Sequence, residues 1–186
     1  MRVNMAGATE TRIKLTYEDY ALFPDNGMIH ELIDGEHYMT PAPETYHQKI
    51  SRRIQFQLYV QVEEKDFGQV INAPVDVQLS SYDIVQPDLI IVLKQHETLI
   101  SPKKVLGPPD LVVEITSESS RSKDRTLKYN LYEKAGVPEY WLVDMENHEV
   151  QKYRLYESRF RLAGSHRQEI SFDGLSGVRV DLGLVW

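Results

Sequence analysis

The sequence predicts an α/β domain, because two helix-like segments with one apolar face alternate with short apolar runs that are typical of buried strands. A chain of 186 residues suits one domain with a complete hydrophobic core. No internal repeat, low-complexity tract or long linker divides it. We therefore expect a single domain over residues 1–186, in which the polar residues 1–15 are frayed.

The first part of the chain predicts a short helix, a hairpin and a long helix. The short helix begins near Thr16. The hairpin turns at Asp34 and Gly35, a dipeptide favoured in tight two-residue turns. The long helix covers residues 44–65, because apolar side chains recur there at every fourth position, which is the spacing of a buried helical face. Those side chains are Tyr46, Ile50, Ile54, Leu58 and Val62.

Apolar runs in the middle of the chain predict strands. The segment 69–79 alternates loosely between apolar and polar residues, and the segments 83–94 and 109–116 contain continuous apolar runs. Continuous runs of this length are typical of strands that are buried on both faces.

A second helix and further strands complete the order. A serine within residues 119–122 can cap a helix that runs to Ala135, where Gly136 supplies the C-terminal stop. Residues 137–144 return to a strand pattern, and the rest of the chain has the alternation of short antiparallel strands.

The composition excludes several classes of protein. The formal charge of −7 argues against a strongly basic, non-specific nucleic-acid binder, although it leaves room for a local basic face. The absence of cysteine excludes disulfides, thiolate zinc sites and cysteine nucleophiles. No stretch approaches the roughly 20 apolar residues of a membrane span, and the N-terminus lacks the apolar run of a signal peptide. We expect a cytoplasmic protein with no membrane partner.

Two acids stand out within the apolar runs. Asp88 interrupts the run in 83–94, and Glu114 interrupts the run in 109–116. An isolated charge in an apolar strand is costly unless it is paired or binds a metal. If the strands are neighbours, a hard cation with oxygen ligands would satisfy both acids. The alternative is that Asp88 follows Pro87 in a strand-opening turn and that Glu114 pairs with a basic side chain.

Lys128 is the basic residue that could complete such a site. It shares one face of the predicted second helix with Asp124, Leu131 and Ala135, because residues three or four apart stack on a helix. This face is mostly apolar, so it should pack on the sheet, and the ammonium could then reach the carboxylates or a bound phosphate. The alternative is a solvated lysine.

Four short motifs follow one another along the chain. They are Gln86-Pro87-Asp88, Val113-Glu114-Ile115-Thr116, Lys128-x3-Tyr132 and Gly136-Val137-Pro138-Glu139-Tyr140-Trp141. The series resembles the Uma-type family of restriction endonucleases, within the PD-(D/E)XK nuclease superfamily. The resemblance runs from about residue 16 to residue 144 and includes the segment 30–36 and the helix that begins near His47.

The resemblance implies a restriction-endonuclease-like fold, in which a mixed β-sheet is flanked by helices and the additional antiparallel strands lie at the C-terminus. It also implies hydrolysis of phosphodiester bonds with Mg²⁺ or Mn²⁺ held by Asp88 and Glu114. The superfamily motif places a lysine two residues after the second acid, where this chain has Thr116. We expect Lys128 to supply that lysine from the following helix.

Glu31 and His47 join Asp88, Glu114 and Lys128 as candidate catalytic residues. Glu31 is similar to the family's early glutamate and could extend the acidic cluster, although it could also be a surface residue of the hairpin. His47 falls on the apolar face of the long helix, so its ring should point inward. A lone inward histidine is more often a hydrogen-bonded core residue than a ligand.

These residues predict a metal-dependent endonuclease that acts on nucleic acid, DNA more than RNA. A homodimer is expected, because cutting both strands of a duplex commonly needs two active sites. Candidate contacts to backbone phosphates are Arg52, Arg53, Arg121, Lys123 and Arg125. Two alternatives stay open: a catalytically degenerate nuclease fold that binds nucleic acid or protein, which Thr116 supports, and a dimerising structural protein whose interface is residues 150–186.

Overall fold

The computed structural model describes residues 13–116 and 124–186, which are built around a six-stranded mixed sheet. The strand order in this sheet is β11-β10-β9-β8-β6-β3. Strands β8 and β9 run parallel, whereas the other neighbouring pairs run antiparallel. The bounds are β3 (Gly68–Asn72), β6 (Leu89–Leu93), β8 (Leu111–Thr116), β9 (Glu139–Asp144), β10 (Glu149–Tyr156) and β11 (Arg159–His166). The predicted α/β class is confirmed.

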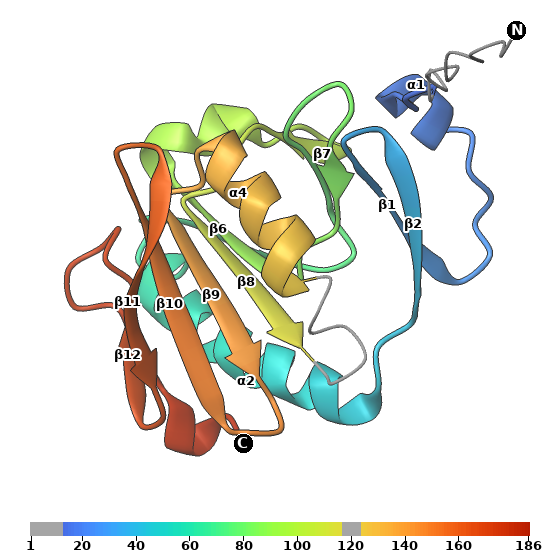
Figure 1. The fold of residues 1–186 in the computed structure, drawn as a ribbon. Helices are drawn as coiled ribbons and strands as arrows, with labels where there is room; N and C mark the ends of the chain where they lie inside the picture. The colour runs from blue at the N-terminus through green and yellow to red at the C-terminus, as the bar shows by residue number, and fades with distance from the viewer. Residues whose placement is uncertain (1–12, 117–123) are drawn as a thin grey trace, which may run out of the picture.

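A second sheet has five strands in the order β2-β1-β5-β4-β7 (Figure 1). Its bounds are β1 (Met28–Ile33), β2 (Glu36–Pro41), β4 (Asp76–Gln78), β5 (Ile84–Val85) and β7 (Lys104–Leu106). Strands β1 and β2 form the predicted hairpin, and both Asp34 (φ 53°) and Gly35 (φ 76°) take the positive φ that a tight two-residue turn requires. A small third sheet pairs β12 (Glu169–Ser171) with β13 (Arg179–Asp181), so the short antiparallel strands predicted near the C-terminus are also confirmed.

Two helices cover opposite faces of the six-stranded sheet (Figure 1). Helix α2 (Thr45–Val62) is the long helix predicted over residues 44–65. Helix α4 (Tyr129–Ala135) is entered through one π-helical turn, η2 (Asp124–Lys128), and ends at Gly136, whose φ is 83°. The serines proposed to cap this helix lie outside the described residues. Shorter helical turns are α1 (Tyr17–Tyr20), η1 (Lys94–Leu99) and η3 (Leu182–Leu184).

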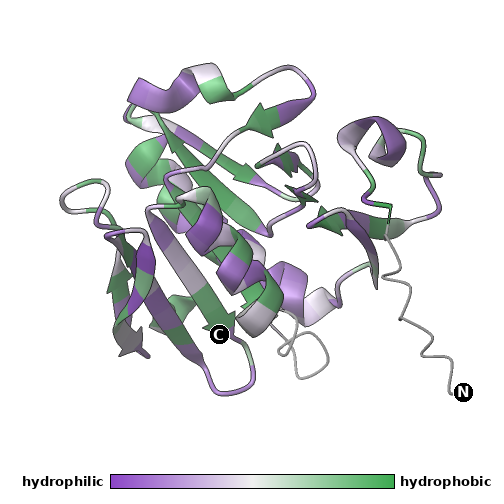
Figure 2. Ribbon diagram, turned by 45° about the horizontal axis from the view of Figure 1, so that its top comes forward, coloured by the Kyte–Doolittle hydropathy of each residue, from purple (hydrophilic) through white to green (hydrophobic). Residues whose placement is uncertain are grey.

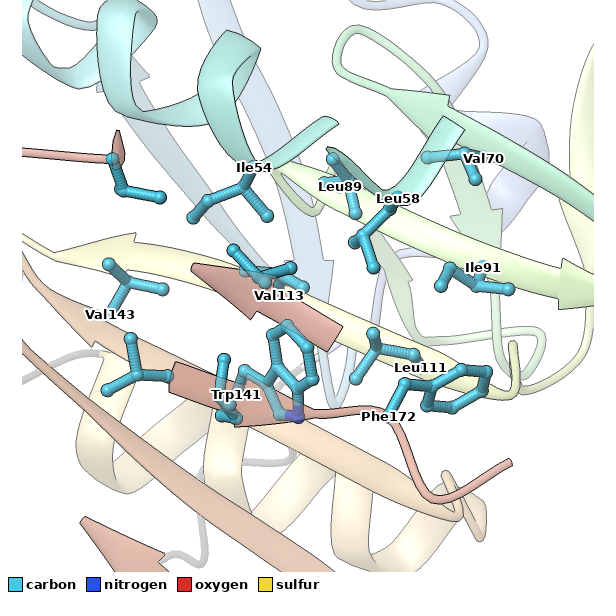
Figure 3. Close-up of a cluster of buried hydrophobic side chains, with 14 of the residues drawn as sticks. Ile54, Leu58, Val70, Leu89, Ile91, Leu111, Val113, Trp141, Val143 and Phe172 are labelled. Carbon is cyan, nitrogen blue, oxygen red and sulfur yellow. The ribbon is translucent and has the colours of Figure 1, made fainter. Parts of the chain in front are cut away.

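The face toward α2 holds one apolar cluster, part of which is drawn in Figure 3. The helix residues Ile50, Ile54 and Leu58 are at most 1% exposed, which agrees with their spacing of four in the sequence. They belong to one cluster with odd-numbered strand residues such as Val113 and Trp141. The odd-numbered positions of β8 therefore face α2.

The face toward α4 holds a second cluster, built on even-numbered strand residues such as Ile90 and Val112. Leu131 and Tyr132 enter it from α4, and Val77 enters it from the five-stranded sheet. Hydrophilic and hydrophobic colours alternate along α4 in Figure 2, as expected for a helix that packs on one side. Because side chains alternate along a strand, Glu114 shares this face with Val112.

Two segments predicted as single strands are each divided between the two large sheets. Residues 69–79 contribute to β3 and β4, and residues 83–94 contribute to β5 and β6. Pro74 and Pro87 lie in the two breaks, and proline has no N–H with which to continue a ladder. The structure therefore places Asp88 at a crossing between the sheets, immediately before β6 and not inside a strand.

The start of the described chain is attached to the hairpin, since the Leu15 N–H donates to the Gly35 carbonyl at 3.0 Å. Residues 1–12, which make up most of the segment expected to fray, lie outside the described residues. None of the helices that the structure describes is both long and apolar enough to cross a membrane.

Candidate active site

Asp88 immediately precedes β6, and Glu114 lies on the neighbouring strand β8. Leu89 of β6 pairs with Val113 of β8, so the next residues along the ladder are Asp88 and Glu114. The Ile115 N–H donates to Asp88 Oδ2 at 2.7 Å, which anchors the aspartate to β8. The structure thus brings both predicted metal ligands to the same end of the β6–β8 pair. The alternative stated for Asp88, that it follows Pro87 at the opening of a strand, also describes its position correctly.

Lys128 reaches Glu114 from the last residue of η2. Its Nζ atom lies 2.9 Å from Glu114 Oε1, and both residues are at most 5% exposed. The Tyr132 hydroxyl donates to the same oxygen at 2.6 Å. Lys128 and Tyr132 are one helical turn apart, so both side chains approach Glu114 from the α4 side of the sheet.

Glu31 of β1 also contacts Lys128. The lysine Nζ lies 2.9 Å from Glu31 Oε1, and the glutamate is 2% exposed. The same carboxylate oxygen accepts the Gln86 N–H at 3.1 Å. Glu31 is therefore a buried member of the cluster, and the interpretation of Glu31 as a surface hairpin residue is wrong.

His47 approaches the cluster from α2, on the other face of the sheet. Its Nε2 atom lies 3.1 Å from the Ile115 carbonyl oxygen and 3.2 Å from Asp88 Oδ2. A carbonyl oxygen can only accept a hydrogen bond, so this contact assigns the proton to Nε2. The ring faces inward, as its position on the helix predicts, and it contacts Asp88.

Buried charges of opposite sign meet at Lys128. The ammonium of Lys128 lies between carboxylate oxygens of Glu31 and Glu114, and Asp88 is bonded to Ile115, the residue after Glu114. This ion pairing offsets the cost of burying the two glutamates. Burial, followed by the charges of Glu114 and Glu31, raises the pKa of Tyr132 well above its ordinary value, which keeps its hydroxyl a donor.

Comparison with known proteins identifies the family. The Uma2 family model, described as "Putative restriction endonuclease", matches residues 17–183. The chain belongs to the Uma2 family.

A solved structure shows the same fold for the Uma2 chain. It is the crystal structure of "a putative nuclease belonging to DUF820" from Anabaena variabilis ATCC 29413, which superposes with a TM-score of 0.76 at 15% sequence identity. The match covers 92% of this chain and 97% of that chain, and it confirms the restriction-endonuclease-like fold. No curated protein matches the chain in sequence.

Thr116 occupies the position where the superfamily motif has a lysine. It is 1% exposed, and its hydroxyl donates to the Val143 carbonyl at 3.3 Å. Residues 114 and 116 of a strand point to the same face, and Lys128 reaches Glu114 from that face. In this Uma2 chain the ammonium of Lys128 therefore occupies the side of the sheet on which a lysine at position 116 would lie.

Two carboxylates and no larger set of side chains are available for a metal. Within residues 13–116 and 124–186, no group of three or more His, Asp or Glu side chains is placed to hold an ion. Magnesium does not need such a set, because it commonly uses one or two carboxylates together with waters and substrate phosphates. The oxygen donors of Asp88 and Glu114 fit Mg²⁺ or Mn²⁺ in this mode.

Sequence reasoning missed two members of the site. The sequence offered Tyr132 only as part of the Lys128-x3-Tyr132 motif, whereas in the structure its hydroxyl bonds Glu114. Gln86 holds Glu31 through its main chain. The spacing of four between Lys128 and Tyr132 could have predicted that the tyrosine lies on the same side of the helix as the lysine. Gln86 could not be predicted in this way, because its main-chain N–H makes the contact and every residue except proline has that group.

The predicted phosphate contacts are only partly described. Arg53 bonds the carbonyl oxygens of Val185 and Trp186, so it joins α2 to the C-terminal residues instead of facing a ligand. Arg52 is exposed. The side chains of the other three candidates, Arg121, Lys123 and Arg125, lie outside the described part of the chain.

Proposed function

We propose that this protein is a metal-dependent endonuclease that hydrolyses phosphodiester bonds of nucleic acid, with DNA as its substrate. The observation that supports this most directly is the position of Lys128, 2.9 Å from carboxylate oxygens of both Glu31 and Glu114. A lysine that is held in place beside a carboxylate of a metal site can stabilise the charge that develops on a phosphate during hydrolysis.

In this proposal Asp88 and Glu114 would hold Mg²⁺ or Mn²⁺. When bound, such an ion supplies Lewis-acid polarisation of a phosphoryl oxygen and activation of water. His47 orients Asp88, because its Nε2–H is directed at Asp88 Oδ2 and the Ile115 carbonyl. Tyr132 orients Glu114 by donating to Oε1.

Lys128 offsets the negative charge that develops on the phosphate oxygens. Glu31 and Glu114 hold its ammonium in place, so little reorganisation is needed when the substrate arrives. Cleavage of both strands of a duplex would need a second site, for which a symmetric homodimer is the simplest source.

Thr116 favours a second candidate, a catalytically inactive module that binds nucleic acid. A threonine bonded to a neighbouring strand cannot contribute a positive charge. In that case Lys128 would serve stability alone, by neutralising the buried glutamates.

The test is incubation of the protein with supercoiled DNA, linear DNA and RNA, in Mn²⁺ or in a chelator. We expect cleavage of DNA in Mn²⁺ and none in the chelator. The matched control for Lys128→Met is Lys152→Met, because Lys152 is also a buried lysine between two acids, Glu139 and Asp173. Retained DNA binding without cleavage of any substrate would instead support the inactive module.

A further inference from the structure

A pocket of about 490 Å³ lies between the five-stranded sheet and the edge of the six-stranded sheet. Its volume is within the range of small-molecule sites, roughly 300–1,000 Å³. Apolar and polar residues line it together. The apolar ones are Ile71, Pro74, Val75, Ile100, Pro102 and Val105, and the polar ones are Gln69, Asp76, Gln86, Ser101, Lys103 and Lys104.

The pocket adjoins the candidate active site through two main-chain contacts. Gln86 lines the pocket with its side chain, and its N–H donates to Glu31 Oε1 at 3.1 Å. The Ala73 N–H donates to the Asp88 carbonyl at 3.1 Å, and the residues that follow Ala73 form one wall of the pocket. Gln86 is two residues from Asp88, a separation of at most about 7 Å along the chain. A substrate group in the pocket would thus lie close to a phosphate at Asp88.

Asp76 is oriented so that one carboxylate oxygen remains for a ligand. Its Oδ1 atom accepts the Tyr20 hydroxyl at 2.7 Å and the Gln86 Nε2 at 2.9 Å. No residue in the described ranges donates a hydrogen bond to Oδ2. Burial, together with the bond to Asp76, raises the pKa of Tyr20, so the tyrosine stays a donor. An acceptor held in this way selects a ligand that presents an N–H.

The opening of the pocket carries positive charge in an otherwise acidic protein. Lys103 is exposed beside the pocket. Lys104 also lines it, but its Nζ already donates to Gln78 Oε1 at 2.6 Å. Lys103 is therefore the residue placed to meet an anionic group of the ligand.

We infer that this pocket holds one nucleobase of the substrate, next to the phosphate that is cut, and that Asp76 selects a base with an exocyclic amino group. The inference rests on the proposed nuclease function. The planar, apolar body of a base suits the aliphatic walls, its amino group suits Asp76, and its phosphate suits Lys103. Thymine fits less well, because the two carbonyl oxygens beside its single N–H would face a carboxylate.

Binding can be measured without cleavage by titrating isotope-labelled protein with dCMP or dTMP in a chelator. We expect dCMP to shift the amide resonances of Gln86 and Val105 and to bind roughly fivefold or more tightly than dTMP. Asp76→Asn should remove this preference, because an amide can rotate to offer either a donor or an acceptor. Glu157→Gln is the control, because it also removes one negative charge but lies on the exposed turn between β10 and β11, far from Asp76 in the sequence. This variant should keep the preference for dCMP.

A second variant protects the test against a folding defect in Asp76→Asn. Lys103→Ala changes an exposed side chain, so it should fold normally, weaken both nucleotides equally and leave the base preference intact. Equal binding of dCMP and dTMP to the wild type, or shifts that avoid the pocket, would overturn the inference even if DNA is cleaved. If dCMP binds in the pocket with a preference that depends on Asp76, but the protein cleaves no DNA, the base site would stand and the proposed DNA endonuclease function would be refuted.

Discussion

The ammonium of Lys128 lies 2.9 Å from a carboxylate oxygen of Glu114, although the two residues are 14 positions apart and belong to different elements. Glu114 points to the face of β8 that α4 covers, and Lys128 closes the π-helical turn that leads into α4. This contact joins the sheet to the helix.

Replacing Lys128 should affect both stability and cleavage. In Lys128→Met, the buried Glu31 and Glu114 would lose the counter-charge of the lysine, so we expect a loss of about 3 kcal/mol in the free energy of unfolding. Urea denaturation measures this loss. Lys152→Met should lose a similar amount, because Lys152 is also buried between acids, yet it should retain cleavage. Cleavage by Lys128→Met at the wild-type rate would exclude the lysine from catalysis.

Tyr132→Phe should destabilise the protein by about 2 kcal/mol, because it removes a hydrogen bond to a buried carboxylate. Tyr129→Phe is the matched control. Its hydroxyl donates to a neutral carbonyl, that of Phe160, at 3.2 Å and should be worth about half as much. Equal losses in the two variants would show that the bond to Glu114 is not specially strong. Weaker Mn²⁺ binding is expected for Tyr132→Phe alone.

The same variant predicts a pH dependence. The pKa of Tyr132 is raised in the folded protein, chiefly by burial, above its value in the unfolded chain. A raised folded pKa means that the stabilisation is complete below about pH 10 and is lost as the pH rises further. The difference in unfolding free energy between wild type and Tyr132→Phe should be constant from pH 7 to 9, begin to shrink near pH 10 and approach a slope of about 1.4 kcal/mol per pH unit above it. A constant difference up to pH 11 would contradict the burial of an ionisable hydroxyl.

Asp88→Asn should abolish the response to metal while preserving the fold. The asparagine retains an oxygen that can accept the Ile115 N–H but loses the negative charge. We expect Mn²⁺ to raise the Tm of the wild type and not that of Asp88→Asn. Asp110→Asn is the control, because Asp110 likewise accepts a main-chain N–H, that of Leu93, at 2.8 Å, away from the site. Equal shifts in all three proteins would remove Asp88 from the metal site.

Moving the lysine tests its relocation. Thr116 and Glu114 share a face of β8, and Lys128 approaches Glu114 from that face. The double variant Thr116→Lys, Lys128→Met should therefore recover part of the DNA cleavage that Lys128→Met loses. Thr116→Lys is expected to cost stability on its own, because Thr116 is buried. No recovery in a double variant that is shown to be folded would mean that the geometry of the helix, and not the charge alone, is required.

Local patterns in the sequence predicted most of the elements correctly. The spacing of Ile50, Ile54 and Leu58 predicted α2, and the Asp34-Gly35 pair predicted the hairpin, because helical period and turn chemistry depend on residues close in the chain. The division of two predicted strands between two sheets was missed. Pro74 and Pro87 were visible in the sequence, but the sheet to which each half belongs depends on distant partners.

The sequence by itself determined the helices, most strands and the absence of thiol chemistry. It also identified Asp88 and Glu114 as acids that need a partner, because a charge in an apolar segment is costly to bury. Only the tertiary structure decided that Glu31 and Glu114 share one lysine, that Tyr132 bonds Glu114, and that His47 meets Asp88 from the opposite face. Periodicity reports which side of an element a residue occupies, whereas a contact depends on how separate elements pack, and packing is a property of the whole fold.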